Sequence, residues 1–423
     1  MRCQSRRAFI KAMGATATLT AAGYFGIGLF GRNPALALPA PPPDAFPSIA
    51  GRTLVIVEMG GGNDGLNMVV PHANARYHDL RRDLAITDAI DLDGEVGLHP
   101  ALGFVAERYG AGDVALIEGV GYPDPDLSHF ASMSTWWSGM PGAVGATGWL
   151  GRYLDGTVGG SNPLAGVSIG PGPNPALVGD AAIVASIQSS AGIAPAWIDD
   201  PDELFGMWSG FAPQDADPGS PLAVARDAIS DTVAASAAIG SRLDGVDAEG
   251  RDLASYLTLA AALTVAPDPP RVIVVHGWGD FDTHEGQATR QEALMGQLDE
   301  ALRTFFTTIE AAQATDHVVV ATTSEFGRRA NYNGSGTDHG TASNHFVIGS
   351  PVAGGRIGEP VDLASLDPRG NPTHTLDFRS YYASLLDGWL GTPHEAVLGQ
   401  SIETLDLVGS TGSSATAGRP RLL

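Results

Sequence analysis

The strongest constraint on the fold of this chain comes from four short apolar runs, each of which ends in a polar loop. Runs of this length that are rich in β-branched residues predict buried strands. Helical patterns separate them, and apolar strands that alternate with helices predict a mainly parallel sheet with helices on both faces, an α/β fold. The four runs are RTLVIVEM (52–59), DVALIEGV (113–120), RVIVVHGW (271–278) and HVVVAT (317–322).

The 423 residues are enough for one large α/β domain. Between about 151 and 270 the sequence changes to turn-rich and Ala-rich helical patterns, which predict an inserted helical subdomain. We therefore expect one domain over 52–408 with an insertion at 151–270. The remaining segments are an N-terminal signal (1–37), a Pro-rich spacer (38–51) and a low-complexity, flexible tail (409–423).

The N-terminus resembles a twin-arginine export signal. Arg6 and Arg7 precede an apolar stretch, and the small residues at 35–37 offer a cleavage site. The alternative is a retained membrane anchor, but the apolar stretch is short for a membrane span. No later segment is long and apolar enough to span. We expect a periplasmic or secreted protein with no membrane span once the signal is removed.

Charge and composition exclude several classes of function. Residues 1–37 hold five basic and no acidic residues, so their removal takes the net charge from −23 to −28. Such a surface repels nucleic acid and anionic lipid, and neither is expected as a partner. Cys3 and Lys11 are the only cysteine and lysine, and both lie in the signal. Thiolate, Schiff-base and Ser-Lys chemistry are therefore excluded, leaving Ser, Thr, His, Asp, Glu and bound metal.

Polar side chains follow the apolar runs, and the carboxyl ends of parallel strands meet at one edge of a sheet. We expect a metal site there, because several acids that ionise together need a compensating cation. The alternative is a salt-bridge cluster with Arg328 and Arg329. Oxygen and imidazole ligands favour zinc or manganese, whereas carboxylates alone suit calcium. The candidate ligands are Asp64, Asp282, His284, Glu325 and His339, with Asp338 and His345 close by in the sequence.

Ser128 and His129 are the candidate catalytic residues. They follow a loop rich in Pro and Asp and precede a helical segment at 130–139. Backbone N–H groups at a helix start favour a serine alkoxide. Plain N-capping is the alternative role of Ser128. His129 has three roles open to it: positioning the serine, binding metal or packing.

The order of these motifs resembles the alkaline phosphatase, sulfatase and phosphopentomutase superfamily. Within it, the chain is most similar to a bacterial family of twin-arginine-exported proteins of unknown function. The resemblance spans nearly all of 52–391 and implies an alkaline phosphatase-like domain. MGGGNDGLN, YPDPDLSHFASMSTWWSG, DFDTHEGQ, TTSEFGRR and GTDHGTASNHFVIG carry the resemblance. It implies a nucleophile at Ser128 and metal ligands at Asp64 or its neighbour Asn63, Asp282, His284, Glu325 and His339.

The chain also departs from the superfamily pattern. Glu325 is followed by Phe326 where the motif has Asp-His, so one usual histidine ligand is missing. His345, His129 or Asp338 would have to replace it, or one metal is lost. SHFAS lacks the Pro and Arg of sulfatase motifs, so formylglycine chemistry is not expected.

Three functions remain open. The first is an exported metal-dependent hydrolase that acts on phosphate or sulfate esters, with a small-molecule or polymeric ester as substrate. The second is a non-hydrolytic metal-binding scaffold, or a partner of another exported protein. The third is a calcium-stabilised structural protein. Bound metal discriminates between them best.

Overall fold

The computed structural model describes residues 45–46, 49, 51–142, 147–158, 162–190, 210, 215, 217 and 220–409. The expected signal at 1–37, most of the spacer at 38–51 and the tail beyond 409 lie outside the described residues. None of the described helices is both long enough and apolar enough to cross a membrane.

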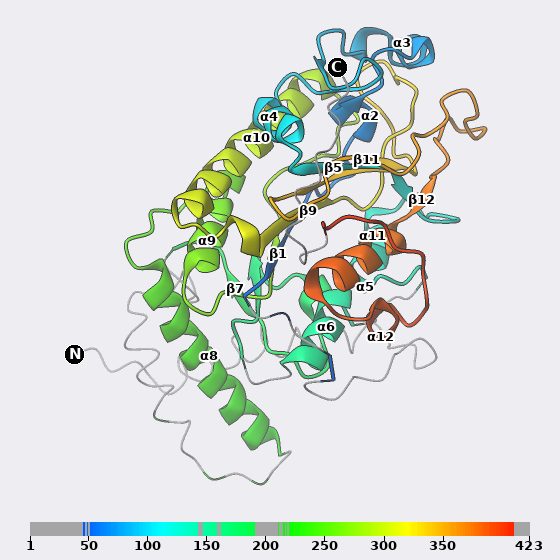
Figure 1. Cartoon of the computed structure of the whole chain (residues 1–423). Helices are drawn as coiled ribbons and strands as arrows, with labels where there is room; N and C mark the ends of the chain where they lie inside the picture. The colour runs from blue at the N-terminus through cyan, green and yellow to red at the C-terminus, as the bar shows by residue number, and fades with distance from the viewer. Residues whose placement is uncertain are drawn as a thin grey trace, which may run out of the picture.

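A nine-stranded, mostly parallel sheet forms the centre of the fold (Figure 1). Its strand order is β11-β5-β10-β9-β1-β8-β6-β7, and β12 also pairs with β5. Only β10 runs antiparallel to its neighbours β5 and β9. The strands are β1 (Thr53–Glu58), β5 (Val114–Gly121), β6 (Gly166–Ile169), β7 (Ala185–Ile187), β8 (Val272–Val275), β9 (Val318–Thr323), β10 (Ser343–Ile348), β11 (Gly355–Ile357) and β12 (Leu376–Asp377).

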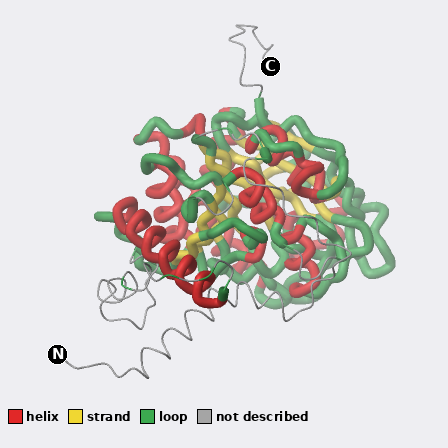
Figure 2. The backbone as a smooth tube through the Cα atoms, turned by 90° about the horizontal axis from the view of Figure 1, so that it is seen from below, coloured by secondary structure: helices red, strands yellow, loops and turns green. Residues whose placement is uncertain are grey.

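Helices cover both faces of this sheet, with the strands enclosed between them (Figure 2). One face packs against α4 (Gly103–Ala111), α9 (Leu253–Val265) and α10 (Gln287–Ala311), and α8 (Pro221–Leu243) packs against α9. The other packs against α5 (His129–Ser138), α6 (Trp149–Thr157), α11 (Phe378–Ser384), a π-helical turn (Leu385–Leu390) and α12 (His394–Leu398). The expected α/β fold with helices on both faces is confirmed.

A small excursion follows β1 before the chain returns to the main sheet. It contains a three-stranded antiparallel sheet in the order β2-β4-β3. Its elements are α2 (Gly65–Met68), β2 (Val69–Val70), α3 (Ala75–Arg81), the 3-10 turn Arg82–Leu84, β3 (Ile90–Asp91) and β4 (Gly97–Leu98). Two further 3-10 turns, Pro175–Leu177 and Thr315–His317, lie in later loops.

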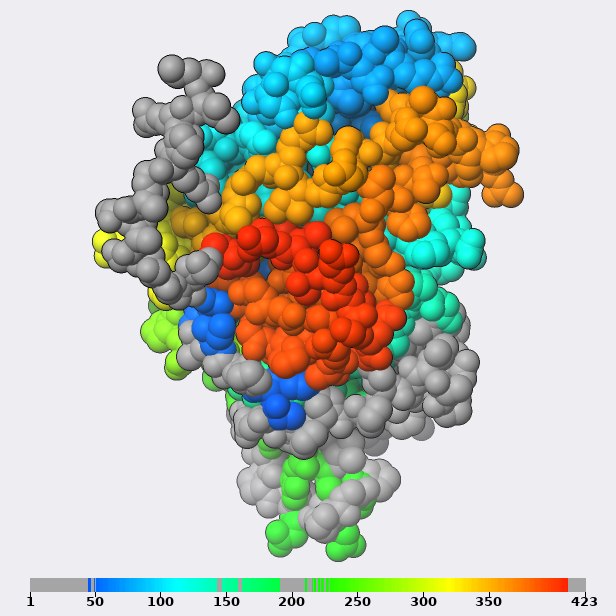
Figure 3. All heavy atoms as spheres, turned by 45° about the vertical axis from the view of Figure 1, so that its right-hand side comes forward, coloured from blue at the N-terminus to red at the C-terminus, as the bar shows by residue number. Residues whose placement is uncertain are grey.

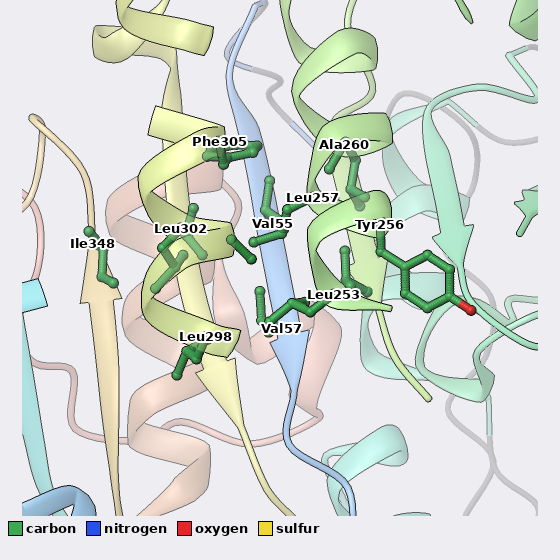
Figure 4. Packing of buried hydrophobic residues seen from close by; sticks show 14 of the residues in the cluster. Val55, Val57, Leu253, Tyr256, Leu257, Ala260, Leu298, Leu302, Phe305 and Ile348 are labelled. Carbon is green, nitrogen blue, oxygen red and sulfur yellow. The ribbon is translucent and has the colours of Figure 1, made fainter. Parts of the chain in front are cut away.

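Strand β1 shows why the sheet is buried on both sides. Its central residues 54–57 are apolar and alternate between the two faces of the sheet. Val55 and Val57 belong to the core with α9 and α10, whereas Leu54 and Ile56 belong to the core on the opposite face. Figure 4 shows Val55 and Val57 between the side chains of α9 and α10. Each side chain of this size that is fully buried contributes about 1.5–3 kcal/mol.

The two ends of the described chain meet on the face shown in Figure 3, where the first residues (blue) lie beside the last helices (red). Arg52 donates to the carbonyl of Trp389 at 2.8 Å and lies 4.6 Å from the centre of its ring. The start of β1 is thereby tied to the π-helical turn.

The region 151–270 differs in part from the helical insertion that the sequence suggests. It contains α8 and α9, as the Ala-rich patterns indicate. It also supplies β6 and β7, which extend the main sheet in parallel from β8. These strands were not predicted, because they are only four and three residues long and lie in a turn-rich stretch.

Asp64, an expected metal ligand, has a structural role instead. Its carboxylate caps α2 by accepting from the amides of Leu66 and Asn67. Both oxygens also pair with Arg81, whose side chain is fully buried, and Gln287 donates to the same carboxylate. The lone pairs that a metal would need accept hydrogen bonds in this structure, and metal binding by Asp64 stays a prediction. The side chain of Asn63 contacts Met68 rather than a site residue.

His345 also lies away from the expected site. It is completely buried in β10, where its ring lies parallel to that of Tyr381 and edge-on to that of Trp136. Neither ring nitrogen has a hydrogen-bond partner. Burial lowers the pKa of His345 to about 3. The imidazole is therefore neutral and packs in the core, apart from the other candidate ligands, and metal binding by His345 stays a prediction.

Replacing Asp64 with Asn should lower the free energy of unfolding by about 3–5 kcal/mol, because Arg81 would remain as a buried, unpaired charge. Urea denaturation checks this. The double variant Asp64→Asn/Arg81→Met, which removes both charges, should be more stable than Asp64→Asn alone. Equal urea midpoints for the wild type and Asp64→Asn would contradict the assignment.

His345→Phe should remove an acid-sensitive contribution to stability. Between pH 6.5 and 3 the unfolded chain binds a proton at this histidine and the folded chain does not, so stability rises with pH across that window. Relative to pH 7, the wild type should lose about 2 kcal/mol more than His345→Phe by pH 5. Thermal denaturation at both pH values measures it. His317 is exposed, and the control variant His317→Gln should show the same pH dependence of stability as the wild type. A stability difference between the wild type and His345→Phe that does not change with pH would refute the prediction.

Candidate metal centre

The loops that follow four strands meet at one edge of the sheet. β1 pairs in parallel with both β8 and β9. β5 runs in the same direction, because the antiparallel β10 lies between it and β9. The carboxyl ends of all four strands therefore share an edge, as the strand pattern indicates.

Asp282, in the loop between β8 and α10, lies at the centre of the cluster. Its Oδ1 is 3.0 Å from Nε2 of His339 and 3.1 Å from Nε2 of His284. Its Oδ2 is 3.5 Å from Nε2 of His129. Three imidazole nitrogens from three segments of the chain thus converge on one carboxylate.

Glu325 holds the ring of His129 through its Nδ1 atom. Its Oε1 contacts Nδ1 of His129 at 2.8 Å and accepts from the amide of Gly61 at 2.8 Å. Glu325 is only 2% exposed, and its second oxygen is buried without a partner. A buried carboxylate oxygen without a donor is expensive unless a proton or a cation satisfies it.

The donor set fits a divalent metal. Single ligand atoms of His129, Asp282 and His339 all lie within 4.8 Å of one another, and each of these side chains is partly open to solvent. His284 adds a further nitrogen, 3.0 Å from Nε2 of His339. Imidazole nitrogen together with carboxylate oxygen suits zinc or manganese better than calcium, which takes oxygen ligands.

Arg328 binds the loops of the site to one another. Its guanidinium is fully buried and donates to Oδ1 of Asp282 at 2.7 Å. It also donates to the carbonyls of Gly61, Gly62, Phe281 and Thr337.

Two glycines after β1 allow the close approach that Arg328 holds. Gly61 has φ +112°, and a Cβ there would clash with the backbone of Asp282. Gly62 has φ +84°, and a Cβ there would clash with the ring of Phe326. These conformations favour glycine for steric reasons.

Local interactions shift the pKa values of the cluster in opposite directions. Burial raises the pKa of Asp282, but hydrogen bonds from Arg328 and His339 outweigh burial and lower it to about 2. The hydrogen bond to Glu325 raises the pKa of His129. Burial lowers the pKa of His339. The cluster thus pairs an ionised carboxylate with a histidine that resists protonation and another that favours it.

The carbonyl of Leu127 and the side chain of His129 hold Ser128 at the rim of the cluster. That carbonyl contacts Nδ1 of His339 at 2.9 Å. Ser128 is the N-cap residue of α5 by position, but its side chain makes no capping hydrogen bond. The residue is exposed. Capping therefore does not occupy this hydroxyl.

Asp338 lies at the outer side of the cluster, where its carboxylate contacts Nδ1 of His284 at 3.3 Å and Arg329 at 3.1 Å. Phe326, which stands where the superfamily motif has histidine, packs against the rings of both His129 and His339. The structure brings together His129, Asp282, His284, Glu325, Asp338 and His339, whereas Asp64 and His345 lie elsewhere.

Glu58, the last residue of β1, is a further polar residue at this edge, and it was not among the residues predicted from the sequence. It accepts hydrogen bonds from Trp137 at 2.8 Å and Asn174 at 3.2 Å. Burial raises its pKa to about 7. The sequence feature that could have identified Glu58 is its place within an apolar strand. An acid in such a strand is buried once helices cover both faces of the sheet.

Several solved structures align with most of this chain, but their sequence identities and TM-scores are low. The C-terminal periplasmic domain of EcEptC from Escherichia coli aligns with 89% of this chain and 96% of its own, at 10% identity and TM-score 0.40. A protein described as belonging to the alkaline phosphatase superfamily, from Vibrio parahaemolyticus, aligns with 83% and 70% at 8% identity and TM-score 0.38. Phosphonate monoester hydrolase of Agrobacterium radiobacter aligns with 83% and 78% at 10% identity and TM-score 0.35.

A search of the curated proteins finds no match. Residues 225–399 match the model of a family described as "Protein of unknown function (DUF1501)". The matched range contains Asp282, Glu325 and His339 and begins after Ser128 and His129. The resemblance to a family of unknown function is confirmed over residues 225–399.

Proposed function

We propose that this protein is an exported, metal-dependent hydrolase of phosphate or sulfate esters. The observation that carries the proposal is the convergence of His129, His284 and His339 on Asp282 at a partly open edge of the sheet. Structural salt bridges need no such set of imidazoles, whereas metal hydrolases use them because neutral nitrogen ligands leave the ion strongly electrophilic.

The charge balance of the cluster supports a single divalent ion. Asp282, Glu325 and Asp338 carry three negative charges when ionised, against the two positive charges of Arg328 and Arg329. His129, Asp282 and His339 would hold the ion, with His284 as a further donor. A divalent ion bound there would polarise the ester and neutralise its oxygens. The occupied cluster would then carry net positive charge, which suits an anionic ester.

Ser128 is the proposed nucleophile. Its exposed hydroxyl lies in the chain between Leu127 and His129, both of which contact the cluster. The serine oxygen would form the bond to phosphorus or sulfur, and the ester oxygen would leave as the alcohol with the proton that the serine gives up. Water would then release the anion and return a proton to the serine. Glu325 holds the ring of His129 in place during both steps.

Export by the twin-arginine route is part of the proposal and rests on the sequence of residues 1–37. This route usually carries folded proteins, often with metal or cofactor already loaded. A metal site made from several distant segments agrees with such export, because it exists only after folding.

The purified protein should bind one zinc or manganese ion per chain. Elemental analysis gives the stoichiometry, and saturating metal at 100 times Kd should stabilise the fold by about 2.7 kcal/mol. His339→Ala should lose this binding. Affinity should be weaker at pH 6 than at pH 8, because the raised pKa of His129 makes protons compete with the ion.

His72→Ala is the matched control, since His72 also pairs with an aspartate, Asp91, but lies far from the cluster in the small sheet region. It should bind metal like the wild type. Binding of calcium but neither zinc nor manganese, or unchanged binding by His339→Ala, would contradict the proposed site.

The metal-loaded protein should hydrolyse p-nitrophenyl phosphate or p-nitrophenyl sulfate, and Ser128→Ala should lower kcat by at least about 100-fold. Release of p-nitrophenol measures both. Ser134→Ala, on the same helix, should retain activity. If metal binds stoichiometrically and neither ester is hydrolysed, the non-hydrolytic scaffold is the correct function.

A further inference from the structure

Phe130 is the most exposed large apolar side chain in the part of the chain that the structure describes. Its exposed fraction is 90%, and the next most exposed, Leu222, reaches 53%. Phe130 directly follows Ser128 and His129 in the first turn of α5. A phenylalanine left in water forgoes about 1.5–3 kcal/mol of burial. Its position beside the candidate site leaves it available to a ligand bound there.

The apolar surface continues along the same helix. Met133 and Trp137 lie three and seven residues after Phe130, so the three side chains share one face of α5. Both are only partly buried. Trp137 is fixed by its hydrogen bond to Glu58 at 2.8 Å. We call Phe130, Met133 and Trp137 the α5 strip.

The size and place of the α5 strip favour a small ligand over a protein. Three side chains on one helix face are far fewer than the about 20–30 residues that each partner contributes to a stable protein interface. The strip begins at Phe130, next to His129, whose imidazole belongs to the cluster. A group that extends from an ester held at the cluster would reach the strip first.

We infer that the α5 strip binds the organic group of the ester, and that this group is apolar, such as an aryl or alkyl alcohol. The inference rests on the proposed function, because the cluster has to hold the anionic end of the same molecule. Phe130 is then a specificity residue: it contacts the alcohol and takes no part in bond breaking.

The experiment compares phenyl phosphate with inorganic phosphate by titration calorimetry on the zinc-loaded full chain. A Ser128→Ala background prevents turnover. Phenyl phosphate should bind about five- to tenfold more tightly than inorganic phosphate, because part of the Phe130 ring is covered. Phe130→Ala should reduce that ratio to within about twofold and leave the affinity for inorganic phosphate unchanged. Phe130→Tyr should keep most of the ratio.

Glucose 6-phosphate, with a polar organic group, should gain nothing from Phe130. Equal affinities for phenyl and inorganic phosphate would overturn the inference while the proposed function stands. An equal loss of affinity for phenyl phosphate and for inorganic phosphate in Phe130→Ala would also overturn the inference. If neither of these phosphates binds and phenyl sulfate does not bind either, the proposed function fails and the inference fails with it. Sedimentation should show the same mass for the wild type and Phe130→Ala, and a dimer lost in the variant would overturn the inference in favour of a second copy.

Discussion

The buried guanidinium of Arg328 is the interaction on which the geometry of the candidate site depends. It binds loop backbone after β1, after β8 and between β9 and β10, together with the carboxylate of Asp282. A guanidinium can do this because its donors fan out in one plane and it stays charged when buried. Lysine has neither the planar fork nor the same resistance to losing its proton. The loops that deliver Asp282 and His339 are therefore held at a fixed separation before any ligand arrives.

Arginine partners also determine which carboxylates remain available to bind a metal ion. Arg81 saturates Asp64, and Arg328 holds only one oxygen of Asp282. The second oxygen of Asp282 faces His129. Acids at one edge of a sheet look equivalent in sequence, yet their partners separate structural carboxylates from candidate ligands. This distribution favours one ion, where the full set of acids in the sequence would suggest more.

Helix α5 presents His129, Ser128 and Phe130 together, and contacts along its length fix its position. Trp137 binds Glu58 at the end of β1, and the carbonyl of Trp136 accepts from Tyr382 at 3.1 Å. The helix ends at Gly139 in the left-handed conformation. One proposed metal ligand, the proposed nucleophile and the residue proposed to contact the organic group are thus carried by one helix that is anchored to the sheet.

The sequence by itself determined the sheet, its direction and the edge that carries the polar loops, because apolar β-branched runs and helical periodicity are local signals. It also placed Asp282, Glu325 and His339 at strand ends. It could not separate these residues from Asp64 and His345, since their partners come from segments far away in the chain. Only the tertiary structure decided that an arginine neutralises Asp64, that His345 is core and that His129 joins the cluster. Burial and pairing, which set the charge and availability of each group, exist only once distant segments pack together.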